Sequence, residues 1–181
     1  MEIIKNSKEL FLVKNLFLAI LGTFILALSS KINIPFWPVP MTMQTFVVMG
    51  IGIVYGWRLG VFTIFLYFSE GLVGLPVFAG TPEKGIGISY FVGPTMGYLI
   101  GFLVTVFLTG YFNFNKNFFN NFLKLVFSVS FIYFFGVLWL GYLIGWDKPI
   151  FTLGVKPFIL AELFKVVILT LLIPKIINLK N

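Results

Sequence analysis

Long apolar runs separated by short polar connections make up nearly the whole chain. The runs cover roughly residues 12–30, 44–57, 59–79, 91–112, 118–145 and 157–174. A helix needs about 20 apolar residues to cross a bilayer, so the pattern predicts six transmembrane helices in one membrane domain, residues 1–181. The second run is short, which favours a tilted or partly buried segment. The last run begins beside Pro157, and proline suits the first turn of a helix.

Composition agrees with an all-α integral membrane protein rather than a soluble one. The chain is 59% apolar and 10% charged, with a mean hydropathy of +1.03, whereas a soluble domain carries about 25% charged residues. Cysteine and histidine are both absent. The chain therefore cannot form a disulfide, a thiolate or histidine metal site, or a Ser-His or Cys-His nucleophile. We expect lipid to cover much of the surface, and neither a metal nor a cofactor to be bound.

Basic residues are distributed unevenly between the two sides of the predicted membrane domain. An even number of spans places both termini on one side, which we expect to be the cytoplasm. The positive-inside rule supports this orientation, because more basic residues then fall inside than outside. Those inside are Lys5, Lys8, Lys14, Arg58, Lys116, Lys124, Lys175 and Lys180, and those outside are Lys31, Lys84, Lys148 and Lys156. No basic face is clustered, so we expect no nucleic-acid partner. The first run also fits a signal peptide, but five further runs favour a spanning helix.

Three connections on the predicted outer side are rich in proline or glycine. They are KINIPFWPVPMTMQTF at 31–46, PVFAGTPEKGIGISYFVGPT at 76–95 and WDKPIFTLGVKP at 146–157. Proline and glycine also occur simply because they break helices between spans. Since all three unusual loops fall on one side, we predict structured outer loops around a binding site that opens to that side.

Three ionisable residues, Glu70, Glu162 and Lys165, fall at membrane depth. Each costs about 2.5–3.5 kcal/mol there, so each requires a partner or a polar cavity. Glu162 and Lys165 are three residues apart and share one helix face, in the outer half of the bilayer beneath the structured loops. They are either an ion pair that neutralises itself or part of a ligand site, and we favour the site. Glu70 fits a structural role, paired with a tyrosine or with backbone near Gly71.

Small residues recur every four positions and predict close helix packing. Glycine stripes lie at Gly52, Gly56 and Gly60 and at Gly93, Gly97 and Gly101. A similar stripe in the first run comprises Ala19, Thr23 and Ala27. The stripe of Ala19, Thr23 and Ala27 fits either a docking face for another membrane subunit or packing inside the bundle.

Two stretches point to a known family. PFWPVPMTMQTF resembles the first-loop stretch of the BioY family, and EGLVGLPVFAG followed by GPTMGYLIGF is similar to that family's most specific signature. The resemblance covers about Ser29 to Lys165. Near the last helix the family pattern is an acidic residue, usually Asp after Gly, three before a lysine. Here Ala161-Glu162 replaces it and Lys165 is retained. The chain also departs at Met96, where the family has glycine, and at Pro82-Glu83-Lys84 in the second outer loop.

The resemblance implies a function, a location and partners. BioY proteins are the biotin-binding S components of energy-coupling-factor (ECF) transporters, multi-pass proteins of the bacterial plasma membrane. It therefore implies biotin uptake together with a transmembrane coupling subunit and two ATPase subunits. The chain has no phosphate-cradling G-x-x-x-x-G-K-[ST] loop of its own. An S component for another vitamin is the nearest alternative. A small integral-membrane enzyme would need an acid/base cluster, and the chain has only 6 acidic residues, so we expect no enzyme.

Biotin's chemistry leads to a hypothesis for the site. A carboxylate such as Glu162 accepts from the ureido N–H groups, and Lys165 donates to the ureido carbonyl, although either end of the ligand can meet Lys165. The proline-rich first loop forms a stiff lid. Tyr98 and Phe91 are candidates for apolar walls, and Gln44 for a hydrogen bond to the polar edge of the ligand. Trp37 beside Phe36 is the candidate cover, and Lys84 or loop amides are candidate partners of the valeryl carboxylate. Trp37 fits an interfacial anchor equally well.

Overall fold

A computed structural model describes the backbone of residues 2–83 and 85–180, and the side chains of residue 10 and of residues 12–83 and 85–179. Five long helices carry the fold: α1 (Glu2–Lys31), α2 (Gln44–Leu72), α4 (Met96–Tyr111), α5 (Phe118–Ile144) and α7 (Ile159–Lys180). Between them lie the short elements β1 (Asn33–Ile34), β2 (Met41–Thr42), α3 (Ile88–Phe91), α6 (Ile150–Gly154) and the 3₁₀ turn η1 (Lys156–Phe158).

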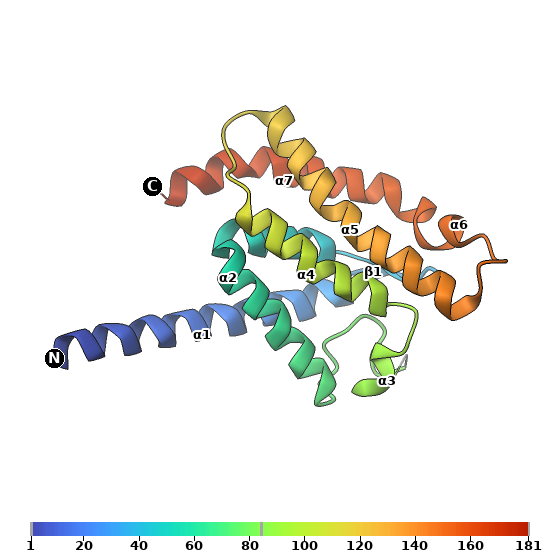
Figure 1. The fold of residues 1–181 in the computed structure, drawn as a ribbon, viewed down its shortest axis with the longest axis horizontal. Coiled ribbons are helices and arrows are strands. Elements are labelled where there is room, and N and C mark those ends of the chain that lie inside the picture. The colour runs from blue at the N-terminus through green and yellow to red at the C-terminus, as the bar shows by residue number, and fades with distance from the viewer. Residues whose placement is uncertain (1, 84, 181) are drawn as a thin grey trace.

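The long helices pack as a row of neighbours. α1 lies against α2, α2 against α4, α4 against α5, and α5 against α7 (Figure 1). The N-terminal part of α1 and the C-terminal part of α7 lie at one end of the molecule, while α3 and α6 lie toward the other end (Figure 1). The connections that the sequence marks as unusual therefore gather at one end of the molecule.

The described residues contain four helical stretches long and apolar enough to cross a membrane. These are Leu12–Lys31, Gln44–Leu72, Phe118–Ile144 and Ile150–Leu179, and the shorter apolar helix Met96–Tyr111 accompanies them. The all-helical membrane architecture is therefore confirmed, while the number of spans and the side of the termini stay predictions. A single helix, α2, covers the predicted second run and the third as far as Leu72, except for a break at Gly56, where φ is 76° and ψ is 170°. The two runs are thus two helical segments joined at a sharp break.

Some boundaries differ from the apolar pattern. The third run was expected to reach residue 79, but α2 ends at Leu72, because Gly74 adopts a positive φ of 95° and the chain turns into the second outer loop. α7 continues to Lys180 although Pro174 lies inside it. Proline removes one intrahelical hydrogen bond, and here the helix nevertheless continues through it.

Glycines let α4 approach both of its neighbours closely. A Cβ on Gly101 would collide with the backbone of Ile132 on α5, and a Cβ on Gly97 would collide with the carbonyl of Phe135, also on α5. On α2, a Cβ on Gly52 would collide with Thr109 of α4. The predicted packing role is confirmed at these positions. Gly56 is different, since nothing lies within 4 Å of its added Cβ. This glycine instead allows the positive φ at the break in α2.

All three outer loops have defined structure. In the first loop β1 and β2 form an antiparallel pair, with Asn33 opposite Thr42 and Ile34 opposite Met41. The second loop contains α3 and is held by side chains from its surroundings: the Ser30 and Tyr67 hydroxyls each donate to the Val77 carbonyl at 2.8 Å. The third loop contains α6 and η1. The prediction that these loops are structured is therefore confirmed.

Candidate functional site

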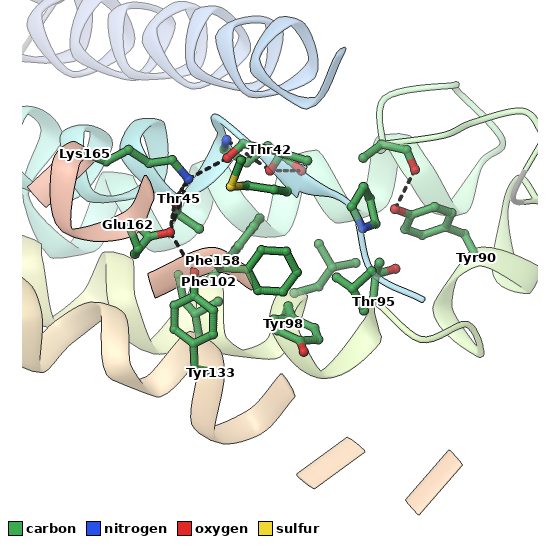
Figure 2. A pocket seen from close by; sticks show the side chains of 17 residues that line it. Thr42, Thr45, Tyr90, Thr95, Tyr98, Phe102, Tyr133, Phe158, Glu162 and Lys165 are labelled. Atoms are coloured by element: carbon green, nitrogen blue, oxygen red, sulfur yellow. Dashed lines mark hydrogen bonds and ion pairs between the residues drawn. The ribbon is translucent and has the colours of Figure 1, made fainter. Parts of the chain in front are cut away.

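A pocket lies where the first two outer loops meet α2, α4, α5 and α7. Its lining contains Val39, Pro40, Met41, Thr42, Gln44, Thr45, Ala79, Tyr90, Thr95, Tyr98, Leu99, Phe102, Ile132, Tyr133, Phe158, Glu162 and Lys165 (Figure 2). Its cavity volume is about 50 Å³, whereas pockets for small-molecule ligands usually measure about 300–1,000 Å³. The pocket is thus nearly filled by its own side chains, and a vitamin-sized ligand requires some of them to move outward.

Glu162 and Lys165 lie side by side in this pocket, on the first turns of α7. Their charged atoms, Glu162 Oε2 and Lys165 Nζ, are 3.2 Å apart, and each residue is only 5% exposed. An isolated charge would be very unfavourable at this depth, so the two must be paired and hydrogen-bonded. The predicted proximity of the two residues is confirmed, and their role toward a ligand stays a prediction.

The Lys165 ammonium uses all of its donors on the protein. It donates to the Thr42 carbonyl at 2.7 Å, to Thr45 Oγ1 at 2.9 Å and to Glu162 Oε2 at 3.2 Å. An ammonium has three N–H groups. Lys165 can therefore donate to a ligand only by giving up one of these bonds.

The two oxygens of Glu162 have different surroundings. Oε2 accepts from Thr45 Oγ1 at 3.0 Å, from the Tyr133 hydroxyl at 2.8 Å and from Lys165 (Figure 2). Oε1 is also buried, but it has no hydrogen-bond partner among the described residues. Buried polar groups almost always have partners in folded proteins. An unpaired carboxylate oxygen in a pocket wall fits the binding of a ligand that carries an N–H or O–H donor.

Gln44 lines the pocket, but its amide belongs to a network beside it. Its Nε2 donates to the Tyr67 hydroxyl at 2.8 Å, and its Oε1 accepts from Thr42 Oγ1 at 3.3 Å. Tyr67 in turn donates to Val77 in the second outer loop. Gln44 therefore links the first loop to the second, whether or not it also contacts a ligand.

The other predicted site residues are divided between the pocket and its surroundings. Tyr98 lines the pocket, and its hydroxyl donates to the Gly154 carbonyl at 2.9 Å, which ties the third loop to α4. Phe91 is not among the lining residues; its ring packs edge-on against Phe78 at 5.3 Å. Trp37 is 76% exposed and also outside the lining, as an interfacial anchor would be.

Two further details concern the predicted cover and the carboxylate partner. Phe36 packs edge-on against Phe158 at 5.9 Å, and Phe158 lines the pocket, so the first loop supports the wall indirectly. Lys84 lies outside the described residues. Within residues 2–83 and 85–180, no group of His, Cys, Asp or Glu side chains is arranged to hold a metal ion.

Sequence reasoning missed Tyr133, Thr45 and Tyr90. Tyr133 lies within the apolar stretch FIYFF of α5, and a buried tyrosine hydroxyl usually requires a partner, which was the available signal. Thr45 lies inside the first-loop stretch next to Gln44. Tyr90 lines the pocket and donates to the Ala79 carbonyl at 3.0 Å. Burial raises the pKa of the Tyr90 phenol above its usual value, in agreement with its role as a donor.

The stripe of small residues on α1 faces into the bundle. Ala19 and Thr23 are buried and Ala27 is half-buried, because α1 packs against α2. Thr23 donates to Glu70 Oε1 at 2.8 Å. Ala19 and Thr23 therefore pack inside the bundle, as the alternative predicts, and a docking role for the stripe stays a prediction. Glu70 is paired through its side chain with a threonine, where we expected a tyrosine or backbone near Gly71.

Comparison with known proteins gives consistent results. Among curated proteins, a probable biotin transporter BioY of Pyrococcus horikoshii is 32% identical over 152 residues, which are 84% of this chain and 89% of that protein. The biotin transporter BioY of Thermotoga maritima is 32% identical over 151 residues, 83% of this chain and 88% of that protein.

A solved structure and a family model agree with these relatives. The crystal structure at 2.1 Å of the S-component for biotin from an ECF-type ABC transporter matches with a TM-score of 0.77 and 27% identity, over 96% of this chain and 93% of that one. The model of the BioY family matches residues 4–181. With a match over nearly its full length, the chain belongs to the BioY family.

Proposed function

We propose that this chain binds biotin and takes part in its uptake as the substrate-specific membrane subunit of an ECF-type ABC transporter. Relatives named biotin transporters align over most of both chains, and the solved neighbour is the S-component for biotin of such a transporter. The family is one of transporter components and not of enzymes, and its members are multi-pass proteins of the plasma membrane. The observation that carries the proposal is the buried Glu162–Lys165 pair in the pocket lining, with one carboxylate oxygen that has no hydrogen-bond partner among the described residues.

The chemistry of biotin suits this pocket. The ureido ring presents two N–H donors, and Glu162 Oε1 is an acceptor without a partner among the described residues. The rings of Tyr98, Phe102 and Phe158 provide apolar walls for the thioether ring and the valeryl chain. Lys165 contributes by fixing Glu162 and, after exchange of one of its own bonds, by donating to the ureido carbonyl. Gln44 stays a candidate for the polar edge, and Phe91, Trp37 and Lys84 stay candidates for contacts in an open form of the loops.

The topology and the partners complete the proposal. We place six spans in the membrane with both termini in the cytoplasm, counting the two segments of α2 on either side of Gly56 separately. The outer loops then face the side from which the vitamin arrives. A transmembrane coupling subunit and two ATPase subunits supply the energy, since a chain of this kind holds its ligand but hydrolyses no ATP.

Binding of radiolabelled vitamins to the purified protein in detergent tests the ligand. We expect saturable binding of biotin, and at least a hundredfold weaker binding of thiamine and riboflavin, because neither presents the same pair of ureido donors to Glu162. An unlabelled biotin chase and a heat-denatured sample serve as controls. Binding of thiamine at least as tight as that of biotin would instead identify the S component of another vitamin.

A further inference from the structure

The unequal environment of the two Glu162 oxygens raises the question of what holds the carboxylate in one orientation. A carboxylate on a flexible side chain can exchange its oxygens by rotation of the terminal torsion, which is broad. Here three donors meet Oε2 and none of the described residues meets Oε1. The donors therefore determine which oxygen is left for a ligand.

The three donors differ in what else they bind. Lys165 donates to the Thr42 carbonyl and to Thr45 Oγ1 as well as to Glu162, so Lys165 and Thr45 hold each other independently of the carboxylate. The Tyr133 hydroxyl has Glu162 Oε2 as its one hydrogen-bond partner among the described residues. Tyr133 is thus the donor that is dedicated to the carboxylate.

The ring of Tyr133 is fixed on two sides. It lies edge-on to Tyr98 at 6.3 Å between ring centroids, and it stacks on Phe158 at 6.2 Å. Tyr133 belongs to α5, whereas Glu162 belongs to α7. Figure 2 shows the tyrosine reaching the carboxylate from the side opposite to Lys165 and Thr42. A hydroxyl held this firmly donates from a constant position.

We propose that Tyr133 is a positioning residue, which commits Oε2 of Glu162 to the protein and so presents Oε1 to a ligand N–H. Tyr133 acts through Glu162 and its hydroxyl does not itself contact the ligand. The inference rests on the proposed function, since the N–H donor is that of the biotin ureido ring. Selectivity for a ligand with a donor at this position then depends on a tyrosine that the ligand does not touch.

The change Tyr133→Phe removes the hydroxyl and keeps the ring contacts. Without its dedicated donor the carboxylate samples orientations in which neither oxygen faces the ligand. Apparent affinity falls with the fraction of protein in the binding-competent arrangement, and with that fraction reduced to about one tenth we expect biotin affinity to fall about tenfold. A second ligand separates this effect from general loosening. It is a biotin isostere in which both ureido nitrogens are replaced by oxygen, so that it has the same shape and no N–H donor. For this cyclic carbonate we expect a change of less than about threefold.

Both affinities are measured by competition against radiolabelled biotin, on the parent, on Tyr133→Phe and on two controls. Tyr98→Phe removes another pocket hydroxyl, one that donates to Gly154 rather than to Glu162, and we expect it to affect both ligands equally. Tyr142→Phe alters an exposed side chain and should change neither affinity. If Tyr133→Phe weakens both ligands equally, or weakens neither, the positioning role is wrong. A parent that binds no biotin would overturn the proposed function itself, and the two failures are therefore distinguishable.

A double-mutant cycle gives an independent test. If Tyr133 acts through the carboxylate, adding Tyr133→Phe to Glu162→Gln should lower biotin affinity by less than about threefold further, whereas independent contributions would multiply. Multiplication of the two losses would contradict the proposal. Folding of each variant is checked by chromatography in detergent. Should Tyr133→Phe not fold, Tyr133→Met, a flexible apolar replacement without a hydroxyl, is measured with the same two ligands and judged by the same outcomes.

Discussion

Glu162 and Lys165 carry opposite charges and are both buried, each with a relative solvent exposure of 5%. Such a pair adds little to stability compared with apolar residues of similar volume, so its presence needs another explanation. The pair provides a charged, oriented acceptor in a pocket that is otherwise lined mainly by apolar and hydroxyl side chains. At the scale of single residues, the proposed ligand site thus depends on how the hydrogen bonds of Glu162 are divided between its two carboxylate oxygens.

The variants Glu162→Gln and Lys165→Met test whether the pair serves the ligand or only neutralises itself. We expect each single change to weaken biotin binding about tenfold to a hundredfold, since each leaves polar groups unpaired, and we expect the double variant not to recover. Biotin affinity is measured for both singles and the double, with folding checked by chromatography in detergent. Parent-like affinity in the double variant would mean that the pair is structural and that the ligand binds nearer the outer loops.

At the scale of elements, glycine residues allow α2 and α5 to pack closely against α4. Gly101 faces the backbone of Ile132 so closely that a methyl group has no room, and backbone cannot yield as a flexible side chain can. α4 also provides Tyr98, Leu99 and Phe102 to the pocket wall. The close contact of α4 and α5 therefore determines how far Tyr133 and Tyr98 lie from each other across the site.

Replacing Gly101 by alanine should consequently destabilise the protein, by about 1–3 kcal/mol, the usual cost of overpacking. We expect a lower midpoint of thermal unfolding in detergent and weaker biotin binding. Gly50→Ala is the matched control: Gly50 also lies in a helix, and nothing lies within 4 Å of its added Cβ. There alanine should be neutral or slightly stabilising, because it lowers the entropy of the unfolded chain. Equal midpoints for the two variants would contradict the packing argument.

At the scale of the whole molecule, the outer loops gather at one end and the termini at the other (Figure 1). The loops are tied to the helices and to one another: Lys31 at the end of α1 donates to the Phe78 carbonyl at 2.9 Å, and Tyr98 donates to Gly154. The pocket is therefore closed by segments from distant parts of the chain, and its small volume reflects this closure.

The proposed orientation is testable because the natural chain has no cysteine. Single cysteines at Lys148, in the third outer loop, and at Lys116, between α4 and α5, report on opposite sides. A membrane-impermeant maleimide should label Lys148→Cys in intact cells, and Lys116→Cys only after permeabilisation. The reverse pattern would invert the topology, and labelling of both from outside would contradict an arrangement in which α5 spans the membrane.

The sequence by itself determined the class of the protein and the local parts of the site. Membrane residence follows from composition, because too few polar residues exist to cover a soluble surface. The helices follow from the long apolar runs, and the pairing of Glu162 with Lys165 follows from a spacing of three, which one helical turn enforces. The family resemblance was also visible in contiguous stretches of the first and second outer loops.

Tertiary structure decided everything that depends on distant segments meeting. Thr45 and Glu162 are 117 positions apart, and Tyr133 is 29 positions from the same carboxylate, so no local pattern relates them. Whether the stripe of Ala19 and Thr23 faces a partner or the bundle was equally open, since small residues suit both and only the packing of α1 on α2 distinguishes them. Local spacing follows from backbone geometry, whereas the meeting of three donors at one oxygen of Glu162 follows from how α2, α5 and α7 pack together.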